Sequence, residues 1–84
     1  GYNSLLISNY QNLASAYYQA QKLDSAEYAL NQKLIYQRKN ANPTQSCETA
    51  ISLMAIASEK GDKLQTDSYA RVTLDFIEKT QNQQ

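Results

Sequence analysis

The side chains that most often perform catalysis or bind metals are scarce in this 84-residue chain. It has no histidine, two glycines and a single cysteine, Cys47. The common general bases, activated nucleophiles and zinc ligands are therefore missing, and two glycines cannot build a loop that cradles phosphate. We expect a protein that is not an enzyme and that needs no cofactor or metal.

The lone thiol has two interpretations. Cys47 falls in the first turn of a predicted helix, where the helix dipole favours a thiolate, and this would suit a redox role. We favour the simpler interpretation, a small buried or half-buried side chain.

The charged residues give no sign of an ion or nucleic-acid site. Eight basic and eight acidic residues give a formal net charge of zero, which disfavours nucleic acid and anionic membranes as partners. Arg38 and Lys39, the one basic pair, fit the end of a helix better than an RNA contact. The later carboxylates lack the spacing of a calcium loop and suit a solvated face: Glu48, Glu59, Asp62, Asp67, Asp75 and Glu78.

No apolar stretch approaches the roughly 20 residues of a membrane span, and no leader pattern is present, so we expect a cytoplasmic protein.

The apolar spacing predicts four helices, at 4–20, 24–38, 43–60 and from 65–67 to 79. Asp24 and Glu27 resemble a capping box, Pro43 suits a first helical position, and Gly61 suits a left-handed stop. We expect an all-α fold of two antiparallel hairpins in a single domain, 1–84. We expect repeat one at about 4–38, a linker at 39–43 and repeat two at about 44–79. A frayed tail should follow at 80–84.

The expected core combines small and large side chains on one face of each helix. The residues predicted to be buried are Leu13, Ala14, Tyr17, Ala26, Leu30, Met54, Ala55, Ala70 and Leu74. A chain this short buries little surface, and the last helix presents Val72, Phe76 and Ile77. Self-association through the terminal helices is the simplest way to cover such a stripe.

The two halves of the chain are similar at an offset of 41. This offset aligns Leu13-Ala14 with Met54-Ala55, Lys22-Leu23 with Lys63-Leu64, and Tyr28-Ala29 with Tyr69-Ala70. We interpret it as an internal repeat. The alternative is two unrelated hairpins of similar composition.

The first half resembles the tetratricopeptide repeat (TPR) family. The resemblance rests on the spacing of Tyr10, Leu13, Ala14, Tyr17, Ala26 and Leu30, and the period near 41 is similar to the longer repeats of kinesin light chains. The second half places Asp67 and Arg71 where the family has Ala and an apolar residue. Either its turn is about three residues longer, which we favour, or the second repeat is degenerate.

The resemblance implies that the first helix of each repeat lines a concave groove that holds a partner. The positions carried over are Ser8, Gln11, Asn12, Ser15, Tyr18, Gln19, Thr49, Ser52, Leu53, Ile56 and Lys60, with Gln11, Asn12, Ser15, Tyr18, Thr49, Leu53, Ile56 and Lys60 as the main candidates. Only Asn12 matches the branch of the family that clamps a terminal carboxylate. For Leu53 and Ile56, packing against a further helix, from a missing repeat or from a second copy of the chain, is an equally good interpretation.

The function expected from the resemblance is a non-catalytic protein–protein interaction module within a scaffold or adaptor. Its partner would be a protein or an extended or helical peptide with apolar anchors. The alternative is a regulatory, peptide-sensing domain of a larger signalling or transcription-control protein.

Overall fold

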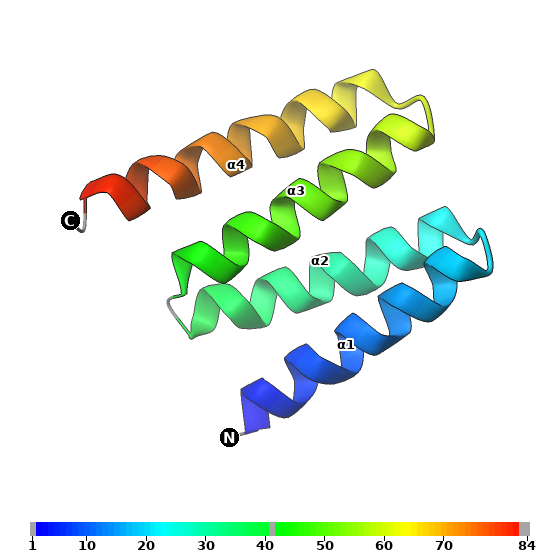
Figure 1. Cartoon of the computed structure of the whole chain (residues 1–84), viewed down its shortest axis with the longest axis horizontal. Helices are drawn as coiled ribbons and strands as arrows, with labels where there is room; N and C mark the ends of the chain where they lie inside the picture. The colour runs from blue at the N-terminus through cyan, green and yellow to red at the C-terminus, as the bar shows by residue number, and fades with distance from the viewer. Residues whose placement is uncertain (1, 41, 83–84) are drawn as a thin grey trace.

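The computed structural model describes residues 2–40 and 42–82, and these residues form four α-helices (Figure 1). They are α1 (Tyr2–Gln19), α2 (Leu23–Lys39), α3 (Pro43–Glu59) and α4 (Lys63–Asn82). The predicted all-α fold of two hairpins is confirmed. Helix α4 is longer at both ends than predicted, so 63–64 and 80–82 are helical. The rest of the predicted tail, 83–84, lies outside the described residues.

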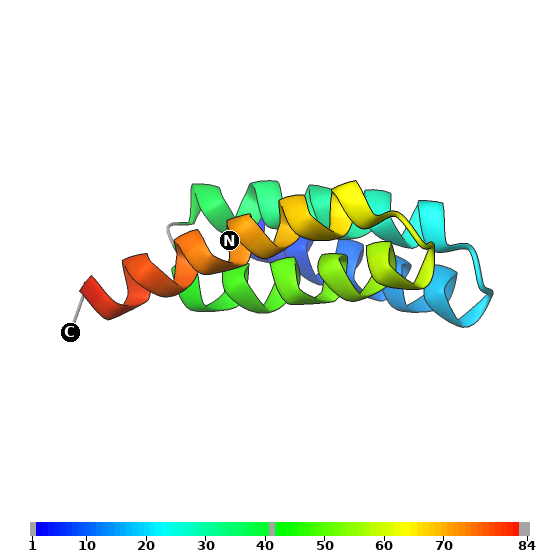
Figure 2. The same ribbon diagram turned by 90° about the horizontal axis from the view of Figure 1, so that it is seen from above.

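The four helices form a flat, two-layered slab. In Figure 2, α2 and α4 occupy one layer and α1 and α3 the other for most of their length. The molecule measures 39 × 32 × 14 Å. Contacts run from α1 to α2, from α2 to α3 and from α3 to α4, so each helix packs on its neighbour in the chain and the α2–α3 interface joins the two hairpins.

The two hairpin turns make the same hydrogen bonds. In the first, Gln21 N donates to Tyr18 O and Lys22 N to Tyr17 O; in the second, Gly61 and Asp62 make the same bonds with Ser58 and Ala57. The left-handed residues are Gln21 (φ 62°) and Gly61 (φ 76°). This pair of bonds is the Schellman helix ending, in which the left-handed position favours glycine, and the predicted stop at Gly61 is confirmed.

The spacing from Gln21 to Gly61 defines the structural period of the chain. Every donor and acceptor of the first turn has its counterpart at this one spacing, so the second turn is no longer than the first. The predicted longer second turn is therefore wrong. The structural period is also one residue shorter than the period that the sequence similarity indicates.

The helix starts show which capping signals are used. The Asn42 side chain accepts a 3.1 Å hydrogen bond from Gln45 N, with Pro43 in the first turn as predicted. The Asp62 side chain accepts a 3.0 Å hydrogen bond from Gln65 N and so caps α4, which begins at Lys63, two residues before the earliest predicted start. The predicted capping box of Asp24 and Glu27 is wrong, because α2 already begins at Leu23. Its N-cap residue is Lys22, whose side chain makes no capping hydrogen bond.

The core is built around alanine, which lets the helices approach closely. Ala26, Ala50 and Ala57 are fully buried. Of the predicted core, Ala14, Ala26 and Leu30 are buried and Tyr17, Met54 and Ala70 half-buried, whereas Leu13, Ala55 and Leu74 are exposed. Phe76, expected on an uncovered stripe, is buried. Cys47 is a free, half-buried thiol packed against the core, in agreement with the simpler interpretation.

Candidate functional site

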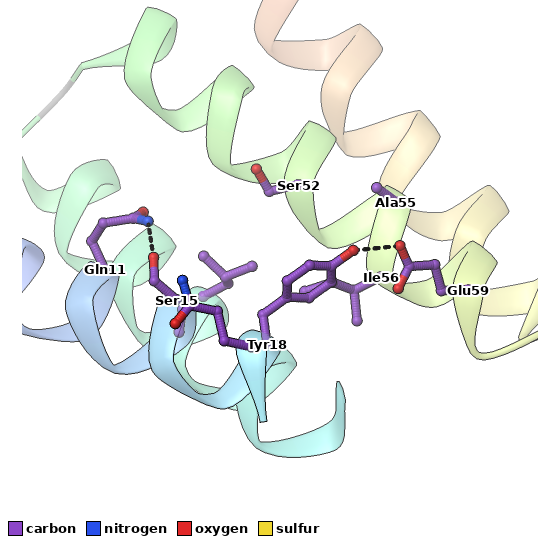
Figure 3. Close-up of a pocket in the computed structure, with 10 residues that line it drawn as sticks. Gln11, Ser15, Tyr18, Ser52, Ala55, Ile56 and Glu59 are labelled. Carbon is purple, nitrogen blue, oxygen red and sulfur yellow. Dashed lines mark hydrogen bonds between the residues drawn. The ribbon is translucent and has the colours of Figure 1, made fainter. Parts of the chain in front are cut away.

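A groove of about 330 Å³ lies between α1 and α3, with α2 beneath it. It has small or polar walls and an apolar floor, as Figure 3 shows. Its lining residues are Gln11, Ala14, Ser15, Tyr18 and Gln19 from α1, Leu30 from α2, and Ser52, Ala55, Ile56 and Glu59 from α3. Because α1 and α3 both pack on α2 rather than on each other, the space above Leu30 stays open.

One end of the groove is closed by Tyr18 and Glu59. The Tyr18 hydroxyl donates a 2.6 Å hydrogen bond to Glu59 Oε1 across the space between α1 and α3 (Figure 3). This hydrogen bond to a carboxylate raises the pKa of the Tyr18 phenol, and the charge of Glu59 adds to the effect. Beyond the bridge a second hollow continues past Gln21 and Leu23. The bridge therefore lies between the two hollows, and both Tyr18 and Glu59 line each of them.

The opposite end carries an amide and a cation. Gln11 donates a 3.1 Å hydrogen bond to Ser15 Oγ, and its carbonyl oxygen accepts one from Lys33 Nζ of α2. Burial lowers the pKa of Lys33, and the charge of Glu48 partly offsets this. The groove therefore has a carboxylate at one end and an ammonium near the other, with hydroxyls and amides between them.

The other face of the slab, between α2 and α4, is bridged by side chains. Tyr69 donates a 2.8 Å hydrogen bond to Glu27 Oε2 and accepts one of 3.1 Å from Asn31 Nδ2. Farther along, the Arg38 guanidinium lies 5.2 Å from the centre of the Phe76 ring. These contacts join the two hairpins on this face, as the hydrogen bond between Tyr18 and Glu59 joins them on the α1–α3 face.

The structure divides the sequence-predicted residues into two groups. Gln11, Ser15, Tyr18 and Ile56 line the groove. So do two of the wider candidates, Gln19 and Ser52. Asn12 is exposed on α1 but is not on the groove wall.

The other candidates do not line the groove, and Ile56 contributes only to its floor. Leu53 is fully buried in the core of the single chain, so its expected outward position is wrong, and no missing repeat or second copy is needed to cover it. Ile56 is 4% exposed and touches the groove only at its floor. Thr49 is buried and donates a 2.7 Å hydrogen bond to Gln37 Oε1. Lys60 points to α2, where its Nζ lies 2.6 Å from Asp24 and 2.8 Å from Glu27.

The misplacement of Leu53 and Lys60 has one cause, the difference of one residue between the predicted and the structural period. One residue rotates a helical position by about 100°, which moves a side chain from one face to another. At the predicted offset, Asn12 corresponds to Leu53, whereas at the spacing from Gln21 to Gly61 it corresponds to Ser52, which does line the groove. The same correction leads from Gln19 to Glu59, a groove residue that was not predicted from the sequence.

Comparison with known proteins gives no match among family models, curated proteins or solved structures. Among residues 2–40 and 42–82, no helix is both long and apolar enough to cross a membrane. The same residues contain no cluster of three His, Cys, Asp or Glu side chains able to hold a metal ion.

Proposed function

We propose that this chain is a non-catalytic protein-interaction module, similar to a pair of tetratricopeptide repeats, that binds an extended peptide in the groove between α1 and α3. The observation that carries the proposal is the groove itself. The α1–α3 face is hollow over an apolar floor, and the hydrogen bond between Tyr18 and Glu59 closes one end of the hollow. A peptide site needs such an accessible hollow with anchors for side chains.

The TPR-like part of the proposal rests on the hairpins. Ala14 and Ala26 are buried, as close helix crossing in that family requires, and the turn hydrogen bonds recur at a regular period. Two features depart from the family pattern: the spacing from Gln21 to Gly61 is longer than the family's usual period, and Leu13 is 45% exposed. The similarity therefore supports the general architecture and the choice of groove.

The lining chemistry favours a particular class of peptide. Leu30 and Ile56 offer an apolar floor to one aliphatic or aromatic side chain. Gln19, Ser15 and Ser52 offer donors and acceptors to the backbone on either side. A basic side chain next to the anchor would face Glu59 and replace the Tyr18 hydroxyl as its partner.

Selection from a random-peptide phage library on the immobilised protein tests the proposal. The selected peptides should share an apolar residue with a basic neighbour. In amide NMR spectra they should shift the signals of Ser15, Tyr18, Ser52 and Glu59 rather than those of Asn31 and Tyr69. Affinity should fall only modestly as salt rises, because the apolar anchor supplies most of the binding energy.

A matched pair of variants separates the groove from the rest of the surface. Ser15→Arg places a long side chain in the groove, whereas Ser68→Arg makes the same change at an exposed position of α4 outside it. We expect Ser15→Arg to weaken a selected peptide by about tenfold or more, which corresponds to about 1.4 kcal/mol, and Ser68→Arg to leave it unchanged. Equal effects, or shifts confined to the α2–α4 face, would contradict the proposal.

A further inference from the structure

The interface between the two hairpins is built from two facing stripes. On α2 they are Leu30, Leu34 and Gln37, and on α3 they are Thr49, Leu53 and Ile56; all six are at most 7% exposed. Gln37 and Thr49 are hydrogen-bonded across the interface, and Leu30 and Ile56 meet at the floor of the groove. Because α2 and α3 are antiparallel, these two contacts set the register and place Leu34 against Leu53.

The structural period, taken from Gln21 to Gly61, shows where the same stripes recur at the ends of the molecule. The counterparts of the α3 stripe on α1 are Asn9, Leu13 and Ala16, and all three are exposed. Leu53 is 0% exposed but Leu13 is 45% exposed, although each lies in the same place within its own hairpin. The difference arises because α2 covers α3, while no described helix covers that side of α1.

The other end of the molecule shows the complementary half. The counterparts of the α2 stripe on α4 are Ala70, Leu74 and Ile77. Ala70 is half-buried, Leu74 is 60% exposed and Ile77 is 38% exposed. The chain therefore presents, at its two ends, the two surfaces that already pack together in its middle.

We propose that two copies of this chain associate head to tail, with α4 of one copy packed on α1 of the next in the register of the α2–α3 interface. Leu74 then lies against Leu13, as Leu34 lies against Leu53, and Ala70 meets Ala16 at a close helix approach. This interface is heterologous, so each added copy leaves one free face of each kind and association continues along one axis.

The end surfaces lack the polar contacts that fix the internal interface. The hydrogen-bonded pair Gln37 and Thr49 is replaced by Ile77 and Asn9. The ion pair of Lys60 with Asp24 is replaced by Ala20 and Leu64. We therefore expect association to be weak and reversible, and to strengthen when these contacts are restored.

Sedimentation velocity of complementary variants tests the geometry. Leu13→Glu blocks the α1 face and Leu74→Glu blocks the α4 face, because each would bury an unpaired carboxylate. The wild-type chain should show a mass that rises with concentration up to the millimolar range. Each variant alone should remain at the monomer mass of 9.5 kDa. Their equimolar mixture should form a dimer and stop there, since only one intact pair of faces is left.

The control is Ile35→Glu, which changes an exposed apolar residue whose counterpart, Asp75, is already charged and exposed. This variant should associate like the wild-type chain. A wild-type chain that stays monomeric, a mixture that stays monomeric, or self-association lost with only one of the two blocking variants would each overturn the head-to-tail arrangement.

A gain of affinity tests the register independently. The pair Ala20→Lys and Leu64→Asp rebuilds between copies the contact that Lys60 makes with Asp24, and Asp67 already stands at the position of Glu27. We expect association tightened by about threefold or more at low salt and a smaller gain at high salt. The pair Ala20→Lys and Leu64→Lys should give no gain. If the first pair fails to tighten association, the proposed register is wrong.

Discussion

Thr49 Oγ1 donates a 2.7 Å hydrogen bond to Gln37 Oε1 inside the interface that joins the two hairpins. Both side chains are buried, with 1% of Thr49 and 3% of Gln37 exposed. A buried acceptor that loses its donor cannot turn to water instead, so the Gln37 amide oxygen depends on Thr49. This pair therefore fixes how α2 and α3 lie against each other in a contact surface that is otherwise mainly apolar.

Thr49→Val should destabilise the fold by about 1–3 kcal/mol, because it leaves Gln37 Oε1 buried without a donor. Gln37→Met should cost less, since the free Thr49 hydroxyl can turn to a carbonyl in its own helix. The double variant should be more stable than the sum of the two losses predicts. Urea unfolding of the three variants measures this coupling, and strictly additive losses would show that the pair contributes no specific interaction.

Lys60→Met should lower the melting temperature by removing the cation that α2 holds with Asp24 and Glu27, at 2.6 and 2.8 Å. These two hydrogen-bonded carboxylates raise the pKa of Lys60. Lys63→Met is the matched control, because the described residues place no carboxylate in an ion pair with Lys63. Thermal unfolding at low and high salt should show a difference between the variants that shrinks with salt. Equal melting temperatures at low salt would mean that solvent screening cancels the contact.

The sequence predicted the helices well wherever a local signal marked an end. Pro43 and Gly61 do what their backbone constraints require, at the start of α3 and in the turn after it. The equivalent turn at Gln21 has the same left-handed geometry, but glutamine gives no sign of it. Asp62 did carry a capping signal for α4, which the expectation of a longer turn concealed.

The faces of the second hairpin were predicted less well, because the similarity between Tyr28-Ala29 and Tyr69-Ala70 favours too long a period. The structure shows that this similarity does not reflect equivalent positions, since Tyr28 is 62% exposed and Tyr69 is buried. Backbone hydrogen bonds in the two turns make the true period one residue shorter. A sequence comparison weighs side-chain similarity and cannot see that geometry, so it placed Leu53 on the groove and Ala55 in the core.

Ala26→Leu should destabilise the protein by about 1–3 kcal/mol, because Ala26 is fully buried where α2 crosses its neighbours and three extra carbons would push the helices apart. Ala16→Leu makes the same change at an exposed site on α1 and, at a protein concentration low enough to keep the chain monomeric, should stay within about 0.5 kcal/mol of the wild type. Denaturant midpoints compare the two. A tolerated leucine at position 26 would mean that the helix crossing has room the structure does not show.

Stability should fall as the pH rises above 10, and Tyr69 should account for part of the loss. Burial raises the pKa of Tyr69 above its ordinary value of 10.0, and Glu27 adds to the rise while Asn31 opposes it. The folded state therefore keeps a proton that the unfolded state releases, so the contribution of Tyr69 is complete below pH 10 and is lost as the pH rises through the folded pKa. Tyr18, whose pKa is also raised, acts in the same direction.

Lys33 acts in the opposite direction, because its lowered pKa makes the unfolded state the better proton binder over the same range. Comparison of Tyr69→Phe with the wild type separates these effects. Urea midpoints measured between about pH 9 and pH 11 should fall less steeply in the variant. Parallel slopes would show that Tyr69 has the same pKa in the folded and unfolded states.

Leu53→Ala should be among the most damaging single changes, with a loss of about 2–5 kcal/mol, because the side chain is fully buried between helices and its removal leaves a cavity. Leu13→Ala is its natural control, since Leu13 occupies the same place in the first hairpin but is 45% exposed. It should cost less than about 1.5 kcal/mol, given that only part of the side chain leaves water on folding.

Urea unfolding at low protein concentration measures both variants without interference from association. The difference between the two losses measures how much the neighbouring hairpin stabilises one leucine. This holds because Leu13 and Leu53 occupy the same place within their own hairpins. A large difference would show that α2 covers Leu53 in solution and that Leu13 and Leu53 are equivalent positions of the two hairpins. Similar losses at the two positions would mean that the hairpins do not pack together as the structure shows, and the groove between α1 and α3 would lose its floor.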